Sequence, residues 1–235
     1  MQSCTKPKSA SKLALLTMAK RPAPGRTKTR LSPPLSPLQA TGLYEAFLRD
    51  TLDLMRQMAG VQPVIAYAPA PEKPYFAGLA PEFDLYLQEG PDLGTRLDNA
   101  FSHHFAMGYD RVVIMDSDSP TLPLSALRAA FEALDRVDVT LGPCDDGGYY
   151  LIGLKRPAPR LLREVRMSTP NVLTDILALA GAESLSVELL TPWYDVDDAA
   201  TLNRLRKELA TAPPATAPNT HQFLNLLNPN SIKIS

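Results

Sequence analysis

Short apolar runs alternate with longer amphipathic stretches along most of the chain, and this alternation constrains the fold more than any other feature of the sequence. Four runs have the length and the polar boundaries of buried strands: 13–19, 62–68, 83–88 and 111–115. Three stretches carry apolar residues at helical spacing: 36–55, 93–107 and 122–134. Because parallel strands need crossover connections, this order predicts a largely parallel sheet with helices on both faces.

The C-terminal half continues the pattern with one irregularity. Residues 137–142 and 149–154 have the composition of two strands that flank a turn, so the sheet is expected to become mixed there. A helix at 169–182, a strand at 185–190 and a helix at 198–209 complete the order. The prediction is an α/β fold, a three-layer sandwich around a mixed, mostly parallel central sheet of about seven strands.

Residues 1–210 are expected to form a single domain, since 235 residues can bury one large core. Residues 211–235 are predicted to be a linker and a C-terminal tail. Within them, 211–219 is rich in alanine, threonine and proline, as linkers are. The last part, 223–235, has two alternatives: it docks as a short apolar segment, or it frays.

Charge and cysteine usage exclude several classes of protein. The 24 basic and 25 acidic side chains are dispersed and give a net charge of −1, which argues against a nucleic acid polymer as partner. Cys4 and Cys144 lack the paired spacing of zinc sites and disulfide scaffolds. The run 13–19 is too short for a membrane span and is followed by Lys20-Arg21 instead of a cleavage site. A soluble cytoplasmic protein is expected, and its oligomeric state is left open.

The loop after the first strand is strongly basic. Ligands of parallel α/β sheets bind beyond the carboxyl ends of the strands, where loops and helix N-termini converge. Here Lys20, Lys28 and Arg30 offer donors for phosphate oxygens, and Gly25 allows close approach of the backbone. The loop differs from a Walker loop because Thr27 stands where a glycine would precede the lysine. A solvated basic loop is the alternative, and the position after the first strand favours phosphate binding.

Acidic residues follow two other strands. Asp116 and Asp118 come directly after the run 111–115 and, being two apart in an extended segment, can approach one hard cation. The alternative is that Asp116 or Ser119 caps the following turn and helix. Asp197 follows the last predicted strand and is either a second metal ligand or the N-cap of the last helix.

The turn between the two strands of the C-terminal half holds Asp145, Asp146, Gly147 and Gly148. The paired glycines let a substrate pass close to the backbone. Either aspartate could bind sugar hydroxyls, orient an acceptor or serve as a base. A purely structural turn is the alternative.

Six segments, taken in this order, carry a resemblance to a known family: 19–31 (AKRPAPGRTKTRL), 92–96 (DLGTR), 116–123 (DSDSPTLP), 142–154 (GPCDDGGYYLIGL), 168–173 (STPNVL) and 194–202 (YDVDDAATL). Together they resemble the nucleotide-diphospho-sugar transferase superfamily, which has the GT-A fold. They are most similar to a bacterial group of GT-A-like glycosyltransferases, some of which are linked to arsenosugar biosynthesis. A more distant resemblance is to 2-phospholactate and molybdenum-cofactor guanylyltransferases.

The resemblance implies a role for each candidate residue. Nucleotide and phosphate binding is implied for five residues: Lys20, Gly25, Lys28, Arg30 and Arg96. A site for Mg²⁺ or Mn²⁺ is implied at three carboxylates: Asp116, Asp118 and Asp197. Catalytic roles are implied for three aspartates: Asp118, Asp145 and Asp146. Contact with the acceptor is implied for the paired glycines: Gly147 and Gly148.

Three functions follow as hypotheses. The first is a metal-dependent transferase, in which a small-molecule acceptor attacks the sugar of a nucleotide-diphospho-sugar. The second is a nucleotidyltransferase, in which a phosphorylated metabolite attacks a nucleoside triphosphate and pyrophosphate leaves. The third is a non-catalytic nucleotide-binding protein, since a fold does not dictate a function.

Overall fold

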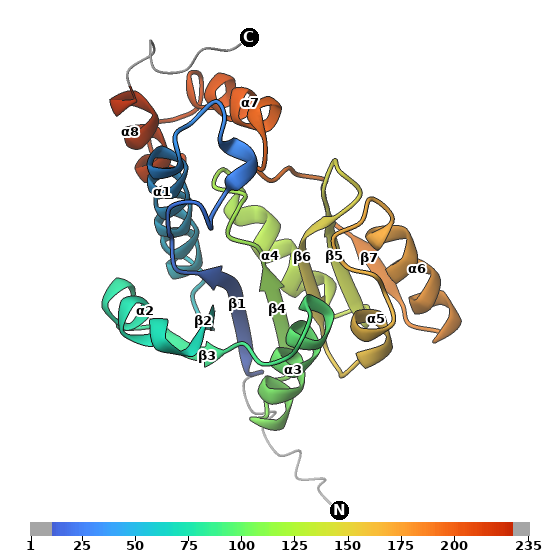
Figure 1. Ribbon diagram of the computed structural model, residues 1–235. Coiled ribbons are helices and arrows are strands. Elements are labelled where there is room, and N and C mark those ends of the chain that lie inside the picture. Colours follow the sequence, from blue (N-terminus) through green and yellow to red (C-terminus); the bar gives the residue numbers. More distant parts are fainter. Residues whose placement is uncertain (1–10, 228–235) are drawn as a thin grey trace, which may run out of the picture.

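The computed structural model describes residues 11–227, which form a seven-stranded sheet between layers of helices (Figure 1). The strands lie in the order β3-β2-β1-β4-β6-β5-β7. Their bounds are β1 Leu13–Lys20, β2 Val61–Ala68, β3 Asp84–Leu87, β4 Arg111–Met115, β5 Val139–Pro143, β6 Tyr149–Leu154 and β7 Val187–Leu189. Only β6 runs antiparallel to its neighbours, β4 and β5. The predicted mixed, mostly parallel sheet is confirmed.

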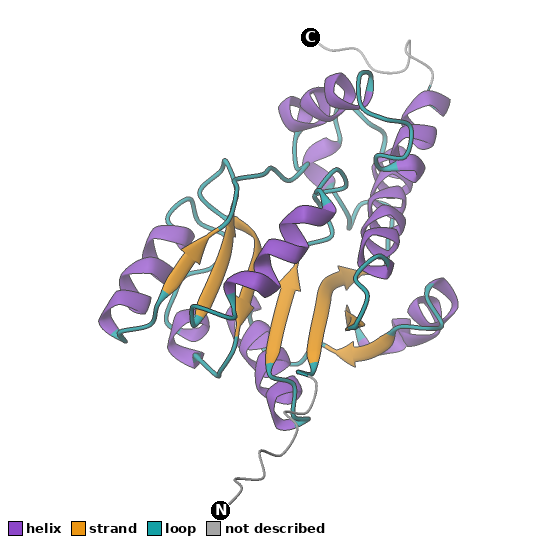
Figure 2. Ribbon diagram, turned by 180° about the vertical axis from the view of Figure 1, so that it is seen from behind, coloured by secondary structure: helices purple, strands orange, loops and turns teal. Residues whose placement is uncertain are grey.

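Helices cover both faces of the sheet, as Figures 1 and 2 show from opposite sides. On one face lie α3 (Leu93–Ala106), α5 (Pro159–Arg163) and α6 (Val172–Ala182). On the other lie α1 (Pro37–Arg56), α2 (Lys73–Leu79) and α4 (Leu124–Ala133). Strand β1 feeds both layers, because Ala14 and Leu16 point into the first core and Leu15 into the second. The three-layer sandwich is therefore as expected.

A third apolar cluster lies beyond the carboxyl ends of the strands and supports the loops there. It joins the short 3₁₀ helix η1 (Thr29–Leu31), the N-terminal half of α1 and α7 (Ala199–Leu209). Leu31 and Val196 are fully buried in it, so the basic loop and the last acidic loop are both anchored by apolar side chains. Helix α1 begins where the sequence predicts, since Ser36 and Gln39 form a reciprocal capping box ahead of Pro37.

The C-terminal segment differs from the expectation of a linker. Helix α8 (Pro218–Leu226) begins inside 211–219 and packs on α1, where the ring of Phe223 lies against Gly42. The Asp50 carboxylate of α1 accepts hydrogen bonds from the main-chain N–H groups of Asn219 and Thr220, at 2.9 and 2.8 Å. It thus caps α8 from a distant part of the chain, which no local pattern could reveal. Residues 228–235 of the predicted tail lie outside the described residues.

Smaller differences concern short elements. The proline-broken connection after β2 contains α2 and the 3₁₀ helix η2 (Ala70–Glu72), and α5 follows β6 unpredicted. The helix expected from 169 begins at Val172, and the strand expected over 185–190 is only three residues long. In these short elements tertiary packing outweighs local propensity. Within residues 11–227, no helix has the length and apolar composition that crossing a membrane requires.

Candidate functional site

The carboxyl ends of β1 and β4 open onto a cleft of about 560 Å³. The loop after β1, the turn after β4, the start of α3 and the segment before α7 all contribute to its walls. The polar residues that matter most here are Lys20, Arg26, Lys28, Arg30, Tyr44, Gln88, Arg96, Asp118 and Asp197. Segments distant in sequence therefore meet at the edge where ligands of parallel sheets bind.

The basic loop lines one side of this cleft. Its turn is closed by the N–H groups of Arg26 and Thr27, which both donate to the carbonyl of Ala23. Gly25 has a φ of +71°, which glycine adopts without strain, but it does not line the cleft. Lys28 also has a left-handed backbone, with φ 49°, and directly precedes η1. The loop thus places cationic side chains in the cleft while Gly25 shapes the turn.

Lys28 joins two of the predicted acidic residues. Its Nζ lies 2.9 Å from Oδ1 of Asp118 and donates to Oδ1 of Asp197 at 2.7 Å. The Lys28 side chain is only 5% exposed, and the two carboxylates are about one-third exposed. Arg30 adds a longer contact of 3.4 Å to Asp197 from a side chain that is 77% exposed. The structure therefore brings together three predicted loops, after β1, after β4 and before α7.

The main chain fixes both aspartates. Val196 donates its N–H to the carbonyl of Asp118 at 3.0 Å, which ties the two acidic loops side by side. Asp198, and not Asp197, caps α7, because its side chain accepts from the N–H of Thr201. The Asp197 carboxylate faces Lys28 and is not the N-cap, whereas its role as a metal ligand stays a prediction.

Asp116 has different surroundings from Asp118. Its carboxylate accepts from the Ser119 hydroxyl at 2.9 Å and from the Asp118 N–H at 3.3 Å, and it does not line the cleft. Burial, and secondarily the neighbouring Asp118 charge, raises the pKa of Asp116. These contacts correspond to the alternative in which Asp116 caps the turn after β4.

The turn at 145–148 lies outside this cleft. Asp145 forms an ion pair with Arg204 of α7, and Asp146 accepts from the N–H of Gly148 at 2.8 Å. Gly147 has a φ of +87°, and a Cβ there would overlap the carbonyl oxygen of Pro170. At Gly147, therefore, the group that lies close to the glycine backbone is the main chain of Pro170 and not a substrate.

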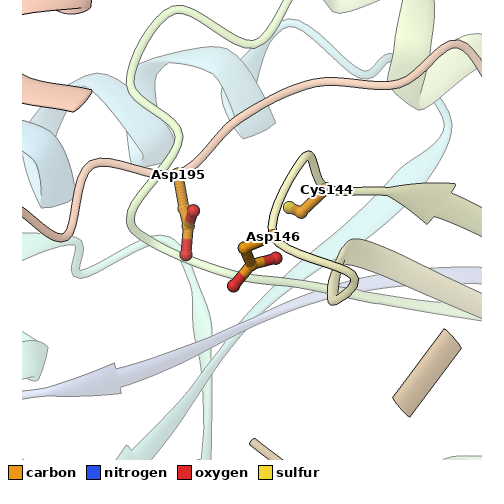
Figure 3. A group of neighbouring side chains, drawn as sticks. All are labelled: Cys144, Asp146 and Asp195. Carbon is orange, nitrogen blue, oxygen red and sulfur yellow. The ribbon is translucent and has the colours of Figure 1, made fainter. Parts of the chain in front are cut away.

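Asp146 belongs to a second polar group, shown in Figure 3 with Cys144 and Asp195. One potential ligand atom from each of the three residues lies within 4.8 Å of the others. Burial, with the Asp197 and Asp146 charges, raises the pKa of Asp195 to about 6. The sequence offered a signal for Asp195, because it alternates with Asp197 in an extended segment.

Sequence reasoning missed three polar residues of the cleft: Arg26 of the basic loop, Tyr44 and Gln88. Tyr44 of α1 is buried, and its hydroxyl lies 2.9 Å from the Ser117 hydroxyl. Gln88 follows β3 and donates its amide to the carbonyl of Ala66 at 2.6 Å. The rule of strand carboxyl ends could have found Gln88. Tyr44 sits among the apolar residues of its helix and gave no signal of its own.

Comparison with known proteins places these features in a family. Residues 51–169 match the family model described as "Uncharacterized protein conserved in bacteria (DUF2064)". The chain is similar to a candidate nucleotide-diphospho-sugar transferase of Desulfovibrio desulfuricans G20. The two are 32% identical, the match covers 92% of this chain and 95% of that one, and the TM-score is 0.85.

Two further proteins are similar to parts or to the fold of this chain. The 2-phospho-L-lactate guanylyltransferase of Methanothermobacter thermautotrophicus is 34% identical over 138 residues, and the chain spans only 59% of that protein's length. Rv0371c of Mycobacterium tuberculosis H37Rv, solved in complex with manganese, is 17% identical with a TM-score of 0.53, over 86% of this chain and 100% of that one. This last likeness concerns the fold alone. The chain belongs to the DUF2064 family and has the GT-A-like fold of the nucleotide-diphospho-sugar transferases.

Proposed function

We propose that the cleft binds the phosphates of a nucleotide-activated donor together with a divalent metal ion, and that the protein transfers a group from this donor to a small acceptor. The observation that carries the proposal is the meeting of Lys28, Asp118 and Asp197 in one cleft at the carboxyl ends of β1 and β4. Cations and carboxylates in one cleft match the two parts of a metal-bound diphosphate.

The two carboxylates fit a hard divalent cation. One oxygen of Asp118 and one of Asp197 already converge on a single cation, the Lys28 ammonium. Mg²⁺ and Mn²⁺ are commonly held by one or two carboxylates, the remaining positions being filled by water and substrate phosphates. When bound, such an ion would neutralise the charge that develops on the leaving diphosphate. Asp116 is the least suited of the three predicted metal ligands, because its carboxylate already accepts hydrogen bonds within its own turn.

The cationic side chains account for phosphate binding. Lys20, Arg26 and Arg96 line the cleft beside Lys28 and Arg30. Arg96 is oriented by donating its Nε–H to the carbonyl of Gly90 at 2.9 Å, which leaves its other N–H groups for an anion. The predicted residues Lys20, Lys28, Arg30 and Arg96 are proposed for this role together with Arg26, which was not predicted, and Gly25 shapes the loop.

We assign glycosyl transfer from a nucleotide-diphospho-sugar as the reaction. The relative from Desulfovibrio desulfuricans G20, a candidate nucleotide-diphospho-sugar transferase, covers nearly the whole chain. Asp146 and Asp195 offer carboxylates that could take the proton of an acceptor hydroxyl. Gly147 and Gly148 stay predictions for acceptor contact, and Asp145 stays one for catalysis. A cytoplasmic location also stays a prediction from the sequence.

Nucleotidyl transfer is the second candidate. It is favoured by the 34% identity to a guanylyltransferase, which spans 58% of this chain. The cationic loop suits a triphosphate, because pyrophosphate would leave among several positive side chains. A phosphorylated acceptor would need no base for its attack, so Asp146 and Asp195 would then have no role in the chemical step.

A donor screen tests the proposal. Purified protein would be titrated with nucleoside triphosphates and with nucleotide sugars, with and without Mn²⁺ or Mg²⁺, while affinity is measured. Product release is measured in the same samples as slow hydrolysis, in which water takes the transferred group in place of the acceptor. Metal-dependent binding of a nucleotide sugar, with release of a nucleoside diphosphate, supports glycosyl transfer. Preference for a triphosphate with release of pyrophosphate supports the second candidate. Binding of neither class would overturn both.

A further inference from the structure

We propose that the Lys28 ammonium keeps the divalent ion out of the Asp118–Asp197 pair until the phosphates of a nucleotide draw the ammonium away. Metal and nucleotide would then bind cooperatively, with nucleotide phosphates required for tight metal binding. This inference rests on the proposed function and assigns Lys28 a second role besides phosphate binding.

The geometry of the ammonium carries the first step. Its 2.7 and 2.9 Å separations from Oδ1 of Asp197 and Oδ1 of Asp118 place it between the two carboxylates. An ion bound by both of these oxygens would occupy nearly the same point. Two cations cannot share it, since like charges a few ångströms apart repel strongly where water is scarce. Lys28 at 5% exposure has little water around it.

The fixed backbone and flexible side chain of Lys28 carry the second step. Its carbonyl accepts from the N–H of Leu31 at 3.0 Å, and Leu31 is fully buried in the third apolar cluster. The loop main chain is therefore anchored, while the four-carbon side chain of Lys28 can rotate. Rotation about side-chain bonds is enough to move the ammonium from the carboxylates into the cleft.

The neighbouring cations supply the third step. Lys20, Arg26 and Arg96 line the same cleft, so a diphosphate held by them would lie within reach of the Lys28 side chain. The Lys28 ammonium can then donate hydrogen bonds to the phosphate oxygens in place of the two carboxylates. Since binding free energies are linked, a nucleotide that releases the pair from Lys28 strengthens metal binding, and the metal strengthens nucleotide binding by the same factor.

Arg30 provides a matched control for Lys28. It comes from the same loop and carries the same charge, but its side chain is 77% exposed, and its ion pair within residues 11–227 is with Asp197, at 3.4 Å. Removing Arg30 takes away one positive charge without emptying the space between the carboxylates. A screened surface contact of this kind contributes little to the affinity of the pair for a cation.

The test measures Mn²⁺ binding by electron paramagnetic resonance in wild type, Lys28→Met and Arg30→Met, first without nucleotide. We expect Lys28→Met to bind Mn²⁺ alone at least about 10-fold more tightly than wild type, and Arg30→Met to resemble wild type. A second substitution, Asp118→Asn, added to Lys28→Met should abolish the gain. Circular dichroism establishes that each variant is folded.

The titration is then repeated with ADP, CDP, GDP, UDP and dTDP in parallel. Wild type should gain about 10-fold or more in Mn²⁺ affinity with at least one of them. Lys28→Met should gain less than wild type, because only the bonds between the phosphates and the ion then couple the two ligands. If wild type shows this gain and Lys28→Met binds Mn²⁺ alone no better than wild type, the inference is wrong and the proposed function stands. If wild type binds Mn²⁺ and nucleotide independently, the inference is wrong whatever the variants do. If it binds no Mn²⁺ with any diphosphate, the proposed function fails.

Discussion

Replacing Asp138 with asparagine should destabilise the protein by an amount that depends on pH. The carboxylate accepts from the Ser186 N–H at 3.0 Å and the Ser186 hydroxyl at 2.8 Å, and it lies near Arg156 and Lys155. These contacts tie the start of β5 to the start of β7, the edge strand. They lower the pKa of Asp138 from 3.8 to about 2, the main-chain hydrogen bond from Ser186 being the largest cause.

The size and the sign follow from linkage. A fall of the Asp138 pKa from 3.8 to about 2 corresponds to about 2.4 kcal/mol, at about 1.4 kcal/mol for each pH unit. Water reaches part of the side chain, so we expect about 1 to 2 kcal/mol. Because the folded-state pKa is the lower one, this stabilisation is fully present above pH 4 and is lost as the pH falls toward 2.

The assay is urea unfolding of wild type and Asp138→Asn between pH 2 and pH 7. The free energy of unfolding should differ by about 1 to 2 kcal/mol at pH 7 and by little near pH 2. Asp135→Asn is the control, because the Asp135 side chain is 60% exposed and, among the described residues, forms an ion pair with Arg111 alone. Its loss should lower the free energy of unfolding by less than about 0.5 kcal/mol. A difference for Asp138→Asn that stays constant over the whole pH range would refute the reasoning.

Three further substitutions test the fold and the site. Asp50→Ala should lower the free energy of unfolding by about 2 kcal/mol, since it uncaps α8, and should speed proteolysis there. Gly147→Ala should lower the melting temperature by several degrees, because its Cβ overlaps the Pro170 carbonyl, whereas Gly181→Ala in open space should not. Asp118→Ala should lower metal-dependent nucleotide affinity or turnover by about 10²-fold; unchanged metal dependence would remove this residue from the site.

The order of strands and helices could be predicted because both rest on local patterns. Strand β1, with Leu15 on one face and Leu16 on the other, is an almost wholly apolar run, interrupted only by Thr17 before Lys20, as is typical of a strand covered on both faces. Helix α8 could not be predicted, since its cap comes from Asp50, 169 residues before Asn219 in the sequence. The sequence of α8 has no sustained apolar period, and the helix is stabilised by packing against the surface of α1.

In the candidate site, too, the features that depend on strand order could be predicted, and those that depend on tertiary side-chain contacts could not. The strand-end rule predicted that Lys28, Asp118 and Asp197 would meet, because it depends only on the order of strands. It could not separate Asp116 from Asp118, since side-chain direction in the turn is set by Ser119. Nor could it show that the turn at 145–148 lies outside the cleft, where Asp145 pairs with Arg204 and Gly147 packs against Pro170.

The position of a bound Mn²⁺ ion tests the central claim most directly. Crystals grown with Mn²⁺ and a nucleoside diphosphate would be measured for anomalous scattering. We predict a peak within about 2.2 Å of a carboxylate oxygen of both Asp118 and Asp197, with the Lys28 ammonium on the phosphates. A bound diphosphate whose Mn²⁺ lies instead among Cys144, Asp146 and Asp195, with Lys28 still between the carboxylates, would contradict the account.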